Sequence, residues 1–176
     1  MDDCSFILKL LAAKPLAKLS GNWFPMASPW QTNSPQIGKT KPNAKVSEQV
    51  PNPEALLDAS AVLAWLQEER GSDKVDEVLD RAAISAVNAT EVVHKLINRG
   101  ATREKAQQIL DQMSLPVLDF TEAMSRECAG LSHHADLALG DRACLATGIT
   151  LGIPVFTADR RWKNLLPTET VQLIRS

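Results

Sequence analysis

From about residue 55 onward, short apolar runs alternate with stretches in which apolar residues recur at helical spacing. The runs are typical of buried strands, and the stretches are typical of amphipathic helices. We expect strands over residues 55–58, 84–87, 115–120, 154–159 and 171–174. Strands that alternate with helices predict a mostly parallel sheet with right-handed crossovers and helices on both faces. The fold class expected is therefore α/β, without internal repeats.

Capping residues and glycines delimit the expected helices. They begin at Ala59, at a cap formed by Ser72 or Asp73, at Asn88 or Thr90, after Thr102, at Thr121 and near Leu139. Gly71 and Gly100 are expected to end the first and third. The third helix predicts an inner face of Val92, Val93, Leu96 and Ile97 and an outer face of Glu91, His94, Lys95 and Asn98. Trp65 fits a core position or a dimer contact.

Residues 1–53 differ from the rest of the chain. Phe6 to Lys14 predicts a short basic amphipathic helix that ends at Pro15. The residues after it are rich in Pro, Ser, Asn, Lys and Gln, a composition that buries too little apolar surface to fold alone. We interpret residues 1–53 as a disordered extension or the product of a translation start too far upstream; the alternative is a peptide that docks on a partner or on nucleic acid. Residues 54–176 form the expected folded domain.

Length and charge limit the classes of function. At 176 residues the chain is long enough for one domain with a sizeable core. The net charge is −2, but residues 1–50 carry six lysines against three acidic residues, so the rest of the chain is acidic. An acidic domain binds nucleic acid only with a local basic rim or with metal ions that mask its carboxylates.

The cysteines indicate a reducing environment. Cys4, Cys128 and Cys144 are odd in number and widely spaced, so no disulfide framework is expected and we predict a cytoplasmic location. No apolar run approaches the length of a membrane span, and Asp2, Asp3 and Lys9 do not fit a secretory signal. We therefore expect no association with a membrane.

Four acidic residues are expected at the carboxyl edge of the predicted sheet. Asp58 and Asp159 end two strands, while Glu91 and Asp141 are expected in the first turns of helices. Carboxyl ends of parallel strands meet at one edge of the sheet, so these four side chains are expected to converge. Each has a purely structural alternative: a helix N-cap or Asx-turn for the aspartates at strand ends, and a favourable helix dipole for the other two. For Glu91 that alternative includes a pair with Lys95, which contributes roughly 0.3–0.5 kcal/mol.

Convergence of the four carboxylates predicts a metal site. Carboxylates a few ångströms apart repel one another, so without a cation some must take up protons. Only oxygen ligands are on offer, with the hydroxyls of Ser60 and Thr157 as supporting groups. Such a set suits Mg²⁺, or alternatively Mn²⁺. A pair of these ions activates a water and stabilises the leaving oxygen in phosphodiester hydrolysis.

Four segments of this sequence resemble the PIN-domain nucleases, and in particular the VapC-type toxins of type II toxin–antitoxin pairs. They are residues 57–64 (LDASAVLA), 90–92 (TEV), 139–143 (LGDRA) and 157–162 (TADRRW), and the resemblance covers roughly residues 55–176. It implies a three-layer α/β/α sandwich and Mg²⁺-dependent endoribonuclease activity. It also implies dimerisation and a cognate antitoxin that blocks the site. The long N-terminal segment departs from the family.

By position, the resemblance assigns Asp58, Glu91, Asp141 and Asp159 as the acidic quartet that binds metal and carries out catalysis. Ser60 and Thr157 would orient ligands or water. The cationic residues near these positions are candidates for contacts with the RNA substrate: Arg142, Arg160, Arg161 and Lys163. Trp162 is a candidate for stacking on a base, with a hydrophobic plug as the alternative.

Two other functions stay open on the sequence. One is a non-catalytic module that keeps the fold and binds a protein or RNA; the other is a housekeeping RNA-processing nuclease. The spacing of Glu91 and His94 also occurs in di-iron bundles, but those need two copies in a helical bundle. His133 and His134 are expected in a solvated loop.

Overall fold

The computed structural model describes residues 52–164 and 170–175 of the chain. The predictions for residues 1–51, which include the basic helix after Phe6 and nearly all of the expected extension, lie outside the described residues.

Five parallel strands form the central sheet, in the order β3-β2-β1-β4-β5. Their bounds are Ala55–Leu57 (β1), Ala82–Ser85 (β2), Val117–Leu118 (β3), Val155–Thr157 (β4) and Val171–Leu173 (β5). The chain builds outward from β1 to β3 and then returns to the other side of β1, where Leu56 lies opposite Val155 of β4. The direction of winding thus reverses between β1 and β4. In an open α/β sheet a crevice lies beyond the strand ends at such a point.

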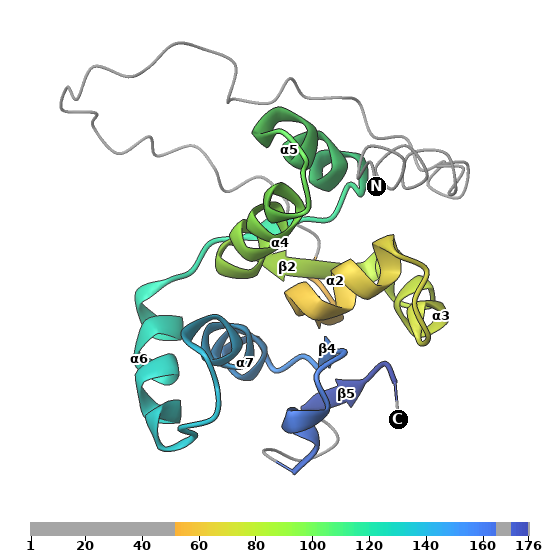
Figure 1. The fold of residues 1–176 in the computed structure, drawn as a ribbon. Helices are drawn as coiled ribbons and strands as arrows, with labels where there is room; N and C mark the ends of the chain where they lie inside the picture. Colours follow the sequence, from red (N-terminus) through yellow and green to blue (C-terminus); the bar gives the residue numbers. More distant parts are fainter. Residues whose placement is uncertain (1–51, 165–169, 176) are drawn as a thin grey trace, which may run out of the picture.

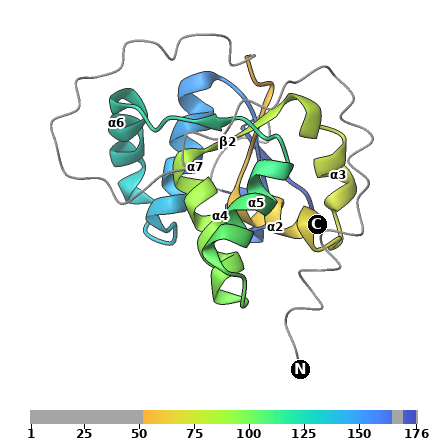
Figure 2. The ribbon, with the colours of Figure 1, turned by 90° about the horizontal axis from the view of Figure 1, so that it is seen from above.

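Helices cover both faces of this sheet (Figures 1 and 2). Their bounds are Ala59–Leu66 (α2), Ser72–Asp76 (α3), Ala86–Asn98 (α4), Arg103–Gln112 (α5), Glu122–Gly130 (α6) and Leu139–Leu151 (α7), with short 3-10 helices at Leu79–Arg81 (η2), Leu131–His133 (η3) and Arg160–Asn164 (η4). Helices α6 and α7 lie on one side of the sheet, and α2, α3 and α5 lie on the other (Figure 2). The predicted three-layer α/β/α sandwich with a parallel sheet is confirmed. Among the described residues no helix has the length and apolarity that crossing a membrane requires.

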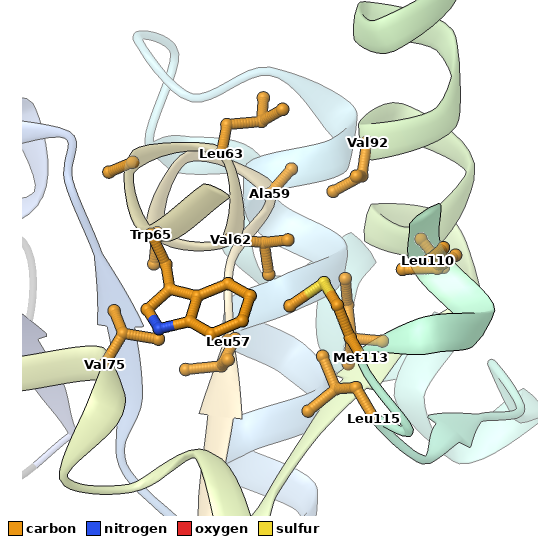
Figure 3. Close-up of a cluster of buried hydrophobic side chains, with 14 of the residues drawn as sticks. Leu57, Ala59, Val62, Leu63, Trp65, Val75, Val92, Leu110, Met113 and Leu115 are labelled. Carbon is orange, nitrogen blue, oxygen red and sulfur yellow. The ribbon is translucent and has the colours of Figure 1, made fainter. Parts of the chain in front are cut away.

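Alternating residues of the strands build two separate apolar clusters. Leu57 of β1 lies beside Trp65 and Val62 of α2 (Figure 3), in a cluster that also contains Leu110 of α5. Leu56 points to the opposite face and belongs to the cluster formed with α6 and α7. A strand buried on both faces reads as a continuous apolar run, as residues 55–57 do. Trp65 is therefore a core residue, and its Nε1 donates to Asp76.

Several helix boundaries agree with the predicted caps. The Thr102 side chain accepts a hydrogen bond from the Lys105 amide, and the Thr121 side chain accepts one from Met124, at the starts of α5 and α6. Gly100 has a φ of 95° directly after α4, and its amide donates to the carbonyl of Ile97. This left-handed residue ends the helix as predicted.

The predicted boundary between β2 and α4 is wrong by two to four residues. Strand β2 ends at Ser85, whose side chain accepts a hydrogen bond from the Asn88 amide and caps the helix. Ala86 and Val87 are consequently helical, although valine favours strands, because the cap and the packing of α4 override that preference. Glu91 therefore lies in the second turn of α4 and not in the first.

Three smaller predictions are also wrong. Helix α3 begins after Gly71, which has a φ of 92° and makes no side-chain cap. Strand β3 covers only Val117–Leu118 of the six residues predicted. Ile97 is 38% exposed, because α4 is too near its end there for both of its apolar rows to reach the core.

Candidate active site

Asp58 lies directly after β1, at the point where the winding of the sheet reverses. It is 3% exposed and is the N-cap of α2, where its Oδ2 accepts a hydrogen bond from the Ser60 amide at 3.1 Å. The capping role considered from the sequence is thus real. It holds the carboxylate at the carboxyl end of β1, so the structural role and the predicted site position coincide.

Three side chains from different elements also donate to the Asp58 carboxylate. Ser60 Oγ lies 2.5 Å and Thr157 Oγ1 3.1 Å from Oδ2, while Asn88 Nδ2 lies 3.1 Å from Oδ1. Ser60 Oγ in turn accepts from the Ala158 amide at 2.9 Å. This network joins α2, α4 and β4 around one buried carboxylate. It places Ser60 and Thr157 against the Asp58 carboxylate, and their role in orienting a ligand or water stays a prediction.

Asn88 and Ser85 belong to this network and were not predicted as site residues. Both are fully buried, and Ser85 Oγ donates to Asn88 Oδ1 at 2.5 Å, which directs Nδ2 toward Asp58. A signal was present in the sequence, because serine at a strand end with a polar residue three positions later is a capping pattern. The pattern shows a helix start but not the direction of the asparagine side chain.

Glu91 reaches the site from the second turn of α4. A Cβ built on Gly140 would lie 3.1 Å from Glu91 Oε2, so this carboxylate lies against the first turn of α7, which carries Asp141. Its other oxygen, Oε1, forms an ion pair with Lys95 Nζ at 2.6 Å. Glu91 therefore forms the predicted ion pair with Lys95 and also lies next to the helix turn that carries Asp141.

Asp141 lies in the first turn of α7, as predicted. Its Oδ2 accepts a hydrogen bond from the Ala138 amide at 3.1 Å and lies 3.8 Å from Nη2 of Arg161. The side chain is 14% exposed. The capping bond orients the carboxylate toward Glu91 and the end of β4.

Asp159 lies two residues beyond β4 and is held by Arg161. Its Oδ1 accepts from the Arg161 amide at 2.9 Å, which is an Asx-turn, and its Oδ2 accepts from the guanidinium Nε at 2.8 Å and Nη2 at 2.5 Å. Because the same Nη2 faces Asp141, Arg161 bridges two of the four predicted acidic residues.

The charges of the four acidic residues act on one another. Burial raises the pKa of Asp58 above its usual range, against hydrogen bonds from Ser60, and the charges of Asp141 and Glu91 raise it further. Burial also raises the pKa of Asp141, with a further contribution from Glu91. The pKa of Asp159 is lowered, chiefly by its hydrogen bonds from Arg161.

The charges of the same acidic residues also act on Cys144, which lies one turn after Asp141 on α7. Burial raises the pKa of its thiol well above the usual range, and the charges of Asp58, Asp141 and Glu91 add to this. The thiol is fully buried, so it lies beneath the acidic residues as part of the apolar floor.

The donor set suits a hard divalent cation. The four groups offer carboxylate oxygens only, and burial disfavours the ionised forms of Asp58 and Asp141 unless a cation is near. In the described part of the chain, no three His, Cys, Asp or Glu side chains surround a single point closely enough to hold an ion in their present positions. Glu91 is paired with Lys95, and Asp159 is paired with Arg161. Binding of a metal ion would require these carboxylates to rotate away from their cationic partners toward the ion.

The candidate RNA-contacting residues differ in exposure. Arg160 and Lys163 are exposed, Arg142 is half-buried, and Arg161 is exposed but engaged with Asp159. Trp162 is fully buried in the cluster of α6 and α7, so the interpretation as a base-stacking residue is wrong and the hydrophobic plug is correct. A single aromatic residue after a polar turn does not reveal from sequence which side of the turn it faces.

The fold and the site place this protein among the parallel α/β/α proteins that bring acidic side chains together at the switch point of the sheet. Residues 55–165 match the PIN domain family, and the chain belongs to that family. No match was found among curated proteins.

Three solved structures illustrate the similarity. A toxin–antitoxin complex from Klebsiella pneumoniae matches with a TM-score of 0.54 at 18% identity, covering 69% of this chain and 98% of that one. DNA-bound VapBC from Salmonella typhimurium matches with 0.56 at 15% identity, covering 69% and 98%. VapBC2 from Rickettsia felis, bound to a DNA fragment from its promoter, matches with 0.55 at 15% identity, covering 68% and 97%. At these identities the likeness concerns the fold.

Proposed function

We propose that this protein is a Mg²⁺-dependent endoribonuclease and the toxin of a toxin–antitoxin pair. The observation that carries the proposal is the placement of Asp58 at the end of β1 and of Glu91 against the first turn of α7, which carries Asp141, in a chain of the PIN domain family. Mn²⁺ has the same preference for oxygen ligands and is expected to substitute.

The acidic residues would hold the metal and place the reacting water. Asp58, fixed by its four hydrogen bonds, is the rigid ligand, and Asp141 on the first turn of α7 is the second. Glu91 and Asp159 complete the shell or accept the proton of the water after they leave Lys95 and Arg161. When bound, the metal ion supplies Lewis-acid stabilisation of the phosphodiester and a water of lowered pKa.

The proposal extends to the partners and the location of the protein. Two of the similar structures are of VapBC bound to DNA, and a third is a toxin–antitoxin complex, which supports a cognate antitoxin as partner of this chain. RNA is the proposed substrate, a homodimer the proposed assembly and the cytoplasm the proposed location.

Replacement of Asp141 by asparagine tests the catalytic proposal. Asp141→Asn keeps the shape of the side chain but removes a ligand charge, so RNA cleavage in Mg²⁺ should fall by about a hundredfold or more, beyond the usual cost of losing an outer-shell group. Asp80→Asn is the matched control, because Asp80 is exposed and immediately precedes Arg81 and β2 at the opposite edge of the sheet. Equal activity of Asp141→Asn and the control would refute the metal role.

The ion pairs at the acidic residues support a second candidate function, a non-catalytic binding module. Lys95 and Arg161 already neutralise two of the acidic residues, as a non-catalytic binding module would require. Calorimetric titration with Mn²⁺ separates the two proposals: a nuclease binds the ion and Asp141→Asn weakens that binding, whereas the module binds RNA or protein without it. Inducible expression distinguishes a toxin from a housekeeping nuclease, because only a toxin arrests growth through Asp141.

A further inference from the structure

A pocket of about 650 Å³ opens beside the acidic residues. It is lined by Ser60, Arg70, Ala158, Asp159, Arg160 and Arg175. Ser60 and Asp159 belong to the candidate active site, so the pocket continues that site along the carboxyl ends of β1 and β4. We call it the arginine pocket.

The fold brings two distant arginines to this pocket by a close backbone approach. Gly71 has a φ of 92°, and a Cβ on it would lie 2.1 Å from the carbonyl oxygen of Ile174. Only glycine permits this contact. The neighbouring residues Arg70 and Arg175 therefore both line the pocket, although 105 positions separate them.

Hydrogen bonds and charge define what the pocket can bind. Arg175 Nε donates to the Ala158 carbonyl at 3.2 Å and Nη1 pairs with Glu69 at 2.6 Å, which leaves Nη2 without a partner among the described residues. Arg70 is exposed and forms no ion pair within the described part of the chain.

Arginines outnumber acidic residues in the lining of the pocket. The pocket has three arginines in its lining, and Arg161 pairs with Asp159 at its edge. Among the described residues, Arg175 pairs with Glu69 and Arg161 pairs with Asp159, while Arg70 has no carboxylate partner. In an otherwise acidic domain, this is the local basic rim that a nucleic-acid ligand needs.

We propose that the arginine pocket binds a phosphodiester group of the RNA strand adjacent to the one held at the acidic residues, with Arg70 and Arg175 as positioning residues. Guanidinium groups match the oxygens of a phosphate in pairs, and the pocket shares Ser60 and Asp159 with the site where the strand would be cut. The inference rests on the proposed function in one respect, namely that the bound nucleic acid is the RNA substrate.

Binding of RNA without hydrolysis tests this inference. The full chain is titrated into a short fluorescein-labelled single-stranded RNA in EDTA, at several KCl concentrations. Arg70→Gln with Arg175→Gln should weaken binding at every salt concentration and reduce the slope of log affinity against log salt by about 0.7, the value for one phosphate contact on a single strand. In Mg²⁺, KM should rise while kcat is unchanged.

The controls separate this inference from loss of the fold and from the nuclease proposal. Arg81→Gln is the matched control, because Arg81 pairs with Glu54 at the opposite edge of the sheet, much as Arg175 pairs with Glu69. Arg70→Gln alone keeps the test valid if the double variant unfolds, because Arg70 has no ion pair to lose among the described residues.

An unchanged salt slope beside normal cleavage would overturn the arginine pocket and leave the nuclease intact. A reduced slope without cleavage by any variant would support the pocket and refute the nuclease. Weakened binding of poly-glutamate together with unchanged binding of RNA would assign the pocket to an acidic protein partner and overturn the inference.

Discussion

Replacing Gly148 in α7 by alanine is expected to destabilise the fold, because the helix backbone lies very close to β4 at this position. A Cβ added to Gly148 would lie 2.3 Å from Cγ2 of Val155 and 3.1 Å from the carbonyl oxygen of Ile153. Val155 is fully buried in β4, between β1 and β5, so it cannot move aside freely. Gly148→Ala should therefore push α7 away from the sheet.

The magnitude follows from two opposing effects. Alanine in place of glycine inside a helix gains about 1 kcal/mol of helix propensity. Overpacking a core typically destabilises a protein by about 1–3 kcal/mol. The cost here should be about 3 kcal/mol, because the added Cβ would lie 2.3 Å from a side chain of a central β-strand. The net loss is about 2 kcal/mol, which for a folded domain of this size lowers Tm by roughly 6–10 °C.

Thermal and urea unfolding followed by circular dichroism measure this loss. Gly130→Ala is the control, because Gly130 ends α6 and a Cβ there meets nothing within 4 Å; this variant should gain up to about 1 kcal/mol. Combining Gly148→Ala with Val155→Ala should recover at least about 1 kcal/mol relative to the sum of the single changes. If Gly148→Ala is as stable as Gly130→Ala, the account of this packing is refuted.

Three further predictions concern the site. Asp58→Asn should flatten the pH dependence of stability in EDTA: burial raises the pKa of Asp58 above 3.8, so the folded state binds this proton more tightly than the unfolded state, and wild-type stability falls as pH rises above 3.8. Urea midpoints measured against pH test this, and a variant with the same pH dependence as wild type would contradict it. Arg161→Gln should tighten Mn²⁺ binding in calorimetry, because Asp159 is released from its ion pair, and it should cost less than about 1 kcal/mol of stability since the guanidinium is exposed; unchanged affinity would count against exchange of partners. Gly71→Ala should cost more than about 2 kcal/mol, because a φ of 92° and the carbonyl of Ile174 both exclude a side chain, and a wild-type melting curve would show the approach to be looser.

The sequence by itself was sufficient for the order of the elements. Apolar runs such as residues 55–57 and helix signals such as Thr102 and Gly100 act through neighbouring residues, so they can be recognised in the sequence. The positions of Asp58 and Asp159 could be predicted for a similar reason, because a residue just after a parallel strand lies at the carboxyl edge of the sheet. Those of Glu91 and Asp141 depend on where helices α4 and α7 begin.

The tertiary structure alone decided how the side chains at that edge are used. The bond from Asn88 to Asp58, the bridge that Arg161 makes between Asp159 and Asp141, and the burial of Trp162 all depend on elements far apart in the sequence. The arginine pocket is the strongest example, since Arg70 and Arg175 line one pocket where Gly71 lets two backbone segments approach closely. Local propensity carries no information about such contacts; they arise when the sheet closes and the helices pack on it.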